Sequence, residues 1–421
     1  MSSSFPSQNP EVTLSLSLQS IPTNRSEDVN PEERGIKLIE LLLSCAGHTS
    51  SGNLHHADAC LRQILQHASI NGDSMQRLSA RFVSALAARL VKRWPGLYKA
   101  LNNTKPARHD LDRAWSIFTQ QFPCMAFAYS IIKQVLIQVM SHERIIHIID
   151  LGSGDPNLWV PFIQGLGHVP DGPPPHLRIT FVGQNKVAQE NIGARLVKEA
   201  ESLDLPFQFN PVNVSLTELT LDMLKVKSGE ALALISISSL HALLAEDDRV
   251  NSHFGSSKNN GVKDSKQMNE FLAMVKSMSP KVVLLVEQES DHNHYRLVDR
   301  FVEALHYYSA WFDSISVAYG EFSCTDRTML EDMFGNEIEN IVAGEGLERE
   351  KRHERYAKWM VRFGGAGFKP VRLWSGIMDE ARIVVEAHGL KGYKIVNQKA
   401  SLMICWHDRP IYAVSAWTCF S

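Results

Sequence analysis

Residues 144–159 constrain the fold more than any other stretch of the chain. Residues 145–149 are four isoleucines and one histidine, an apolar run that predicts a strand buried on both faces. Gly152 and Gly154 follow it and predict a tight turn that a side chain would obstruct. Asp155 then predicts a helix N-cap, with proline at the first helical position. Strand, turn and helix together predict the first half of a βαβ unit in a Rossmann-like parallel sheet.

The same unit departs from the pattern that binds a dinucleotide or S-adenosylmethionine. Those versions have a third small residue after the second glycine, where this chain has Pro156. They commonly carry an acidic residue after the next strand, but the predicted strand Leu177–Val182 ends in a Gly-Gln-Asn sequence. As an N-cap, Asp155 would also occupy helix amides that an anionic ligand would use. We therefore predict a scaffold with no cofactor. The alternative is a methyltransferase-like protein that binds S-adenosylmethionine or another small ligand at this turn.

The composition and the net charge limit the classes of function that this chain can have. The chain has 421 residues, 44% of them hydrophobic and 21% charged, as in an ordinary globular protein. A net charge of −3 provides no general attraction to DNA or to an anionic membrane. The six scattered cysteines lack a Cys-x-x-Cys pair, which favours reduced intracellular thiols over a disulfide framework or zinc site. We find no signal peptide and no apolar run near transmembrane length, and so expect no membrane association.

Residues 1–30 form a tail that we expect to be disordered, because Ser, Pro, Asn and Gln dominate it. One apolar island interrupts it, since Leu14, Leu16 and Leu18 alternate with polar residues. This alternation places the three leucines on one side of an extended chain, where they would fit a hydrophobic groove on a partner. The other interpretation is a chance alternation without function.

Residues 31–140 predict helices and no strand. An Asn-Pro-Glu-Glu sequence at 30–33 predicts an N-cap, an N1 proline and an acidic first turn. Further helical patterns occupy residues 54–68, 73–90 and 111–140, the last interrupted at Pro123. We expect these helices to form a cap beside the sheet. The charged, helical stretch 326–362 is predicted to join this cap.

After the first βαβ half, strand and helix patterns alternate. Strands are predicted at 177–182, 206–211, 231–237 and 281–287, with helical stretches between them. The chain closes with strands 401–406 and 411–417 around a His-Asp-Arg-Pro turn, which predicts an antiparallel hairpin. The predicted fold class is α/β, with a Rossmann-like, mostly parallel sheet, a C-terminal antiparallel hairpin and an α-helical cap. Five parallel strands followed by a hairpin is also the outline of class I methyltransferases.

The leucine-rich stretches 38–90 and 196–224, Pro280 and residues 301–308 match the blocks of one known family in the right order. Together they resemble the plant GRAS-domain proteins of the scarecrow-like branch. The resemblance covers roughly residues 32–421. Its core motif, Val-His-Ile-Ile-Asp with isoleucine for valine, corresponds here to Ile146, His147, Ile148, Ile149 and Asp150, followed by Gly152 and Gly154. Its C-terminal motifs correspond to Arg352, Glu354, Trp406, Arg409, Pro410, Ser415, Ala416 and Trp417.

The resemblance implies a non-enzymatic role in transcriptional regulation in the nucleus. It implies action through DNA-binding partners, notably zinc-finger transcription factors of the indeterminate-domain class, with DNA contact mainly indirect. It also implies homo- or heterodimers with other GRAS proteins. The leucines at 14, 16 and 18 resemble the ethylene-response-factor amphiphilic repression motif, whose partners are Topless-type corepressors. The acidic DELLA signature is absent from residues 1–30, which argues against a hormone-degron role.

The remaining polar residues predict structural roles. We expect His147 to be a core histidine with both ring nitrogens hydrogen-bonded, and Asp150 to cap backbone amides or pair with a cation. His55-His56 and the pair near 292–294 lack further metal ligands and predict solvated positions. No nucleophile elbow, phosphate-binding loop or zinc-protease helix occurs.

Basic residues between Arg349 and Arg362 alternate with glutamates, which predicts i,i+4 ion pairs on a solvated helix. Direct DNA binding along a local basic groove is the remaining alternative.

Overall fold

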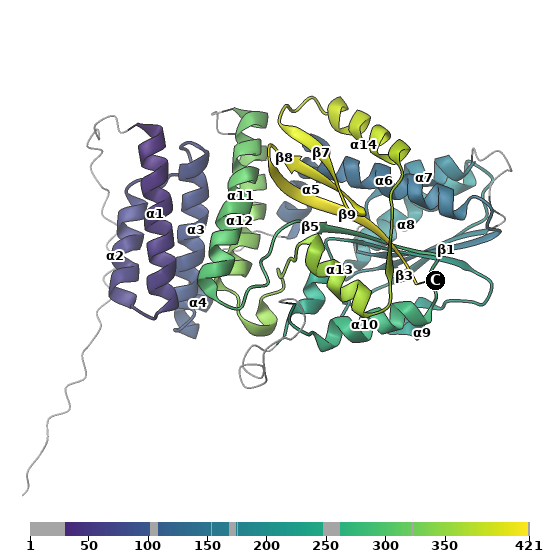
Figure 1. The fold of residues 1–421 in the computed structure, drawn as a ribbon, viewed down its shortest axis with the longest axis horizontal. Helices are drawn as coiled ribbons and strands as arrows, with labels where there is room; N and C mark the ends of the chain where they lie inside the picture. Colours follow the sequence, from purple (N-terminus) through teal and green to yellow (C-terminus); the bar gives the residue numbers. More distant parts are fainter. Residues whose placement is uncertain are drawn as a thin grey trace, which may run out of the picture.

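A helical cap and an α/β core lie side by side in the computed structural model (Figure 1). The structure describes residues 30–101, 108–152, 154–167, 174, 176–246, 262–320 and 324–419. Leu14, Leu16 and Leu18 lie outside the described residues. Buried side chains from both parts belong to one continuous hydrophobic cluster, so cap and core share a packed boundary.

The core is a mostly parallel sheet, as predicted. Its order is β3-β2-β1-β4-β5-β9-β8-β7, and the short β6 also pairs with β9. Strands β1 to β5 run parallel, while β6 to β9 form antiparallel pairs. The strands are β1 (Ile145–Leu151), β2 (His176–Val182), β3 (Phe207–Val212), β4 (Ala231–Ile237), β5 (Val282–Gln288), β6 (Lys369–Val371), β7 (Tyr393–Gln398), β8 (Ser401–Trp406) and β9 (Arg409–Thr418). The terminal hairpin β8–β9 is confirmed, and β9 inserts it beside β5.

Helices cover both faces of the sheet (Figure 1). Alternate residues of β1 explain this, because Ile146 and Ile148 enter one hydrophobic cluster and Ile149 and Leu151 enter the other. The first face carries α6 (Pro123–Met140), α7 (Pro156–Gly167), α8 (Lys186–Glu201) and α14 (Ser375–Ala387). The second face carries α9 (Leu221–Leu224), α10 (Lys266–Ser277) and α13 (Tyr356–Gly365).

The sequence analysis expected no apolar run near transmembrane length, and helix α6 corrects that expectation. Its 18 residues have a mean hydropathy of 1.3, which is long and apolar enough for a membrane span. Within the fold 67% of this helix is buried, and it packs against α14 and α7. Its apolar composition therefore reflects a helix packed in the interior between the sheet and other helices.

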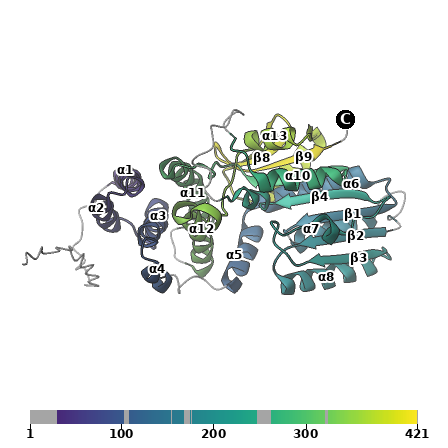
Figure 2. The ribbon, with the colours of Figure 1, turned by 90° about the horizontal axis from the view of Figure 1, so that it is seen from below.

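Figure 2 shows the cap helices grouped at one end of the sheet. Asn30 caps the first helix as predicted, accepting a hydrogen bond from the Glu32 amide. Asp73 and Gln76 form a full capping box at the third. The cap consists of α1 (Pro31–Ser50), α2 (Leu54–Leu65), α3 (Ser74–Val91), α4 (Pro95–Leu101), α5 (Arg108–Gln121), α11 (Leu297–Tyr319) and α12 (Thr325–Ala343).

The division between cap and core differs from the sequence prediction in three helices. Helix α6 lies on the sheet, whereas α11, outside the stretches predicted for the cap, packs on α3 and α12. Within the stretch 326–362, α12 joins the cap as predicted, whereas α13 packs against the sheet. Helices α4 and α14 and strands β6 and β7 have no counterpart among the elements predicted from the sequence.

Candidate functional site

A cleft of about 690 Å³ lies at the carboxyl ends of β1, β2, β4 and β5. In parallel α/β sheets this edge, at the point where strand order reverses, is the usual place for a ligand. Gly152 and Gly154 line it with φ values of +99° and +51°, which glycine adopts readily. Residues of α5 and α12 line it from the cap side. The predicted Gly turn therefore lies in a real concavity between cap and core.

Two aspartates beside the turn are committed to structural hydrogen bonds. Asp155 caps α7 as predicted, because its Oδ1 accepts from the Asn157 amide at 2.8 Å. The Tyr129 hydroxyl donates to the other carboxylate oxygen of Asp155, also at 2.8 Å. Asp150 is fully buried, and its Oδ2 accepts from the Trp159 indole at 2.7 Å. This indole was not among the backbone amides and cations expected as partners of Asp150.

The cleft residues do not fit S-adenosylmethionine in the way that class I methyltransferases hold it. The end of β2 brings Gly183, Gln184 and Asn185 to the cleft, with no carboxylate for ribose hydroxyls. The Asn185 side chain accepts from the Ala188 amide and so caps α8. A Cβ on Gly154 would lie 3.0 Å from the ring of Phe181, so this turn is already closely packed.

Replacing Gly154 with alanine should lower the free energy of unfolding by about 1–2 kcal/mol, because its left-handed backbone disfavours a side chain. Gly364 in α13 provides the matched control, since a Cβ there meets nothing within 4 Å. The Gly364→Ala variant should raise the free energy of unfolding by up to about 1 kcal/mol. Urea unfolding measures both, and equal effects would contradict the strained turn.

His147 is a core histidine, and the prediction that both ring nitrogens are hydrogen-bonded is confirmed. Its Nε2 lies 2.8 Å from Thr180 Oγ1, and its Nδ1 lies 3.1 Å from Glu230 Oε2. Arg178 donates to the same Glu230 oxygen at 2.5 Å. Burial, helped by the Arg178 charge, lowers the pKa of His147 to about 4. This buried network joins β1, β2 and the start of β4 and lines no part of the cleft.

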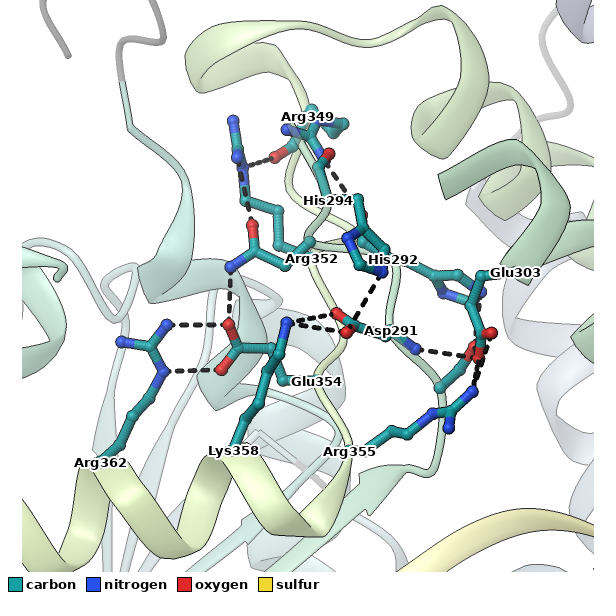
Figure 3. Close-up of polar contacts among 12 residues, drawn as sticks. Asp291, His292, His294, Glu303, Arg349, Arg352, Glu354, Arg355, Lys358 and Arg362 are labelled. Atoms are coloured by element: carbon teal, nitrogen blue, oxygen red, sulfur yellow. Dashed lines mark hydrogen bonds and ion pairs between the residues drawn. The ribbon is translucent and has the colours of Figure 1, made fainter. Parts of the chain in front are cut away.

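The stretch from Arg349 to Arg362 is not a solvated helix, and that prediction is wrong. Arg349, Arg352 and Glu354 are buried in irregular chain ahead of α13. Arg362 and Glu354 form a two-bonded ion pair at 2.6 and 2.8 Å (Figure 3). Arg352 donates to backbone carbonyls, including that of Arg349 at 2.9 Å. Charges that the sequence pattern placed in solvent are therefore ion-paired or hydrogen-bonded inside the fold.

Glu303 on α11 pairs with arginines from two stretches that match the family's motifs. Arg355 donates to it at 2.8 Å, and so does Arg409 at the start of β9. Burial opposes ionisation, but hydrogen bonds from these two arginines outweigh it and hold the pKa of Glu303 well below its usual range. Nearby, Lys358 pairs with Asp291 at 2.7 Å (Figure 3). The structure thus brings together residues that the sequence places in separate motifs.

The ion pairs of Glu303, Glu354 and Asp291 form a polar centre, and three buried histidines lie beside it. The histidine at 292 is one of them, so the prediction that it is solvated is wrong. His292 and His353 are fully buried, with their Nδ1 atoms 2.9 Å apart. The rings of His241 and His353 lie 4.1 Å apart. Burial lowers the pKa of His292 to about 3, and that of His353 also lies well below its usual value. Among the described residues no group of three or more side chains is placed to hold a metal ion.

The C-terminal motif residues from Trp406 to Trp417 lie in the β8–β9 hairpin of the sheet. The Trp406 indole donates to Asp313 Oδ2 at 2.7 Å and so ties β8 to α11. The Trp417 indole donates to Ser415 Oγ at 2.9 Å. Ala416 is buried where β9 pairs with β5 and β6, and Pro410 lies at the register shift opposite Cys405. None of these residues lines the cleft.

Comparison with known proteins identifies the family. The GRAS domain family matches residues 38–418. "Scarecrow-like protein 3" of Arabidopsis thaliana is 40% identical over 447 residues, covering 95% of this chain and 92% of that protein. "Scarecrow-like transcription factor PAT1" of the same plant is 33% identical, covering 89% and 75%. The crystal structure of SCL7 in Oryza sativa has a TM-score of 0.77 at 28% identity, covering 90% of this chain and 99% of that one. This chain belongs to the GRAS domain family.

Proposed function

We propose that this chain is a non-enzymatic transcriptional co-regulator that acts in the nucleus through protein–protein contacts. Family membership supports the regulatory role, because a relative covering most of the chain is named a transcription factor. The observation that carries the non-enzymatic part is the capped N-terminus of α7. Asp155 occupies the helix amide beside the Gly turn, and β2 ends without a carboxylate for a cofactor.

The proposed DNA-binding partners are zinc-finger transcription factors of the indeterminate-domain class, which would bring this chain to DNA indirectly. Charge supports the indirect mode, since the net charge is −3 and the arginines at 352, 355 and 362 are engaged within the protein. A second copy or another GRAS protein is the proposed dimer partner. Exposed Ile36, Ile39 and Leu65 on the cap helices offer apolar surface for it.

The proposed corepressor contact lies in the tail. Leu14, Leu16 and Leu18 would enter a hydrophobic groove of a Topless-type corepressor as an extended segment. Changing all three to alanine should abolish corepressor pull-down by the full chain. The melting temperature should stay unchanged, because the tail precedes the first capped helix at Asn30.

A matched control changes the other side of the same segment. Ser15→Ala with Ser17→Ala should preserve the pull-down, since an extended chain points these residues away from the leucines. Undiminished corepressor capture by the triple-leucine variant would remove the repression claim.

A further inference from the structure

The amino ends of the parallel strands form a second edge of the sheet, opposite the edge that holds the cleft. Exposed basic side chains follow one another along this second edge, at the ends of the elements that meet there. These residues are called the basic rim, and they are Arg144 before β1, Lys225 and Lys227 between α9 and β4, Lys276 in the last turn of α10, Lys281 before β5 and Lys369 at the start of β6.

An ion pair holds one half of the basic rim together. Lys281 pairs with the carboxylate of Glu143, the residue directly before Arg144. Strand β4 lies between β1 and β5, so the turn before it enters the sheet between Arg144 and Lys281. The amide of Lys227 in that turn donates to Glu230, the residue directly before β4, at 2.9 Å. Arg144, Lys227 and Lys281 therefore lie on three neighbouring strand ends.

Contacts around Cys419 hold the other half together. The Cys419 thiol donates at 3.6 Å to the carbonyl directly before Lys281. The residue before Cys419 pairs with Lys369 across β9 and β6. Lys276 reaches the turn ahead of Lys369, because a Cβ added to Gly367 would collide with the Lys276 Nζ. Neighbouring strands lie about 4.8 Å apart, so the four spacings from β1 through β4, β5 and β9 to β6 give the rim a length of about 19 Å.

Most of the positive charge on the basic rim has no counter-charge within the fold. Among the residues that the structure describes, Lys281 alone of the six rim residues forms an ion pair. Glu230 is engaged inside the fold with Arg178 at 2.5 Å, and Asp222 of α9 is an exposed carboxylate close to the rim in the chain. Since the whole chain has a net charge of −3, this rim has the opposite sign to the protein and attracts an anionic partner.

Exposed apolar side chains lie next to these charges. Ile145, directly after Arg144, is 41% exposed. Leu221 and Met223 of α9, just before Lys225 in the chain, are 42% and 36% exposed. A phosphate backbone gains nothing from such side chains, whereas a peptide can bury its own apolar side chains against them. The combination therefore favours an acidic peptide over a nucleic acid.

We propose that the basic rim binds an acidic segment of a protein partner that also carries apolar side chains. About six extended residues, at about 3.3 Å each, cover the length of the rim. Carboxylates of the segment pair with the lysines and Arg144, and its apolar side chains cover Ile145 and Met223. The rim lies at the opposite edge of the sheet from the cap and apart from the tail. Its test is therefore separate from those of the corepressor and dimer contacts proposed above.

Fluorescence anisotropy with the full chain tests this proposal. The probe is a fluorescein-labelled peptide of glutamates and leucines in equal number, and a second peptide has serine in place of every leucine. The Glu/Leu peptide should bind, and the Glu/Ser peptide of equal charge should bind at least about tenfold more weakly, because it buries no apolar side chain. Arg144→Glu with Lys369→Glu should weaken binding of the Glu/Leu peptide about tenfold, because two attractions become repulsions.

Lys37→Glu with Arg62→Glu is the matched control, since it makes the same change of charge at exposed positions on the cap. This control should leave peptide binding unchanged. If the rim variant does not fold, Lys227→Glu with Lys276→Glu replaces it. Absence of Glu/Leu peptide binding, or equal weakening by the rim and cap variants, would overturn the proposal. A DNA duplex that binds more tightly than the peptide and is released by the rim variant would overturn it in favour of a nucleic-acid surface.

Discussion

Replacing Arg362 with alanine should lower the free energy of unfolding by about 3–5 kcal/mol, the cost of leaving a buried charge without its partner. Arg362 and Glu354 keep only 3% and 1% of their side chains exposed. Removing the guanidinium leaves the Glu354 carboxylate with the Asn293 amide as its only side-chain partner among the residues that the structure describes. Urea unfolding followed by circular dichroism measures the loss.

Arg382 provides the matched control, since it pairs with Asp379 on the surface of α14 with half of its side chain exposed. Arg382→Ala should change the free energy of unfolding by less than about 1 kcal/mol. The double variant Glu354→Leu with Arg362→Met should recover much of the loss, because it removes both buried charges together. Equal losses for Arg362→Ala and Arg382→Ala would restore the solvated-helix interpretation.

Acidification from pH 7 to pH 5 should destabilise the protein by about 2 kcal/mol or more. The folded-state pKa values of His147 and His292 are about 4 and about 3, below the ordinary 6.5, because burial disfavours their charged forms. The unfolded chain therefore takes up protons first as the pH falls below 6.5. Each of these two histidines then costs about 2 kcal/mol at pH 5, and His353 acts in the same direction.

Glu289 partly offsets this loss. Burial raises its pKa to about 7, so the folded state keeps a proton that the unfolded state releases above pH 4.5. Acidification to pH 5 thus returns about 2 kcal/mol through this group. Urea unfolding at pH 7, 6 and 5 measures the net slope.

Variants separate the contributions to this slope. His147→Gln should reduce the loss between pH 7 and pH 5 by about 2 kcal/mol, whereas the exposed His55→Gln should leave it unchanged. A pH slope that is the same in both variants would contradict the assignment to buried histidines.

The sequence predicted the sheet well because its signals are local. The run at 145–149, the Gly turn and the Asp155 cap lie next to one another, and β4 matches its predicted bounds. The missed α14 carried a usable signal, since Ile377, Ala381 and Val385 recur at helical spacing and are buried. The edge strand β7 gave a much weaker sequence signal, because only one side of it is partly buried.

The polar centre and the cleft were beyond a sequence-based prediction because their partners are distant in the chain. Arg352 is satisfied by carbonyls and by Asn293, which no charge pattern reveals. The cleft is lined by residues of α8, β5 and α12, and only the folded sheet and cap bring these elements together. The assignment of helices to the cap was wrong for a similar reason. Apolar periodicity shows that α6 and α11 each have a buried face, but it does not show which element that face packs against.

We infer that this mostly parallel α/β core has no S-adenosylmethionine site and serves as a scaffold for protein partners. Isothermal titration of the full chain with S-adenosylmethionine is the decisive measurement. We expect no binding at micromolar concentrations, since Asp155 caps α7 and β2 ends without a carboxylate. Micromolar affinity that is lost in a Gly154→Val variant, together with methyl transfer to an acceptor, would contradict it.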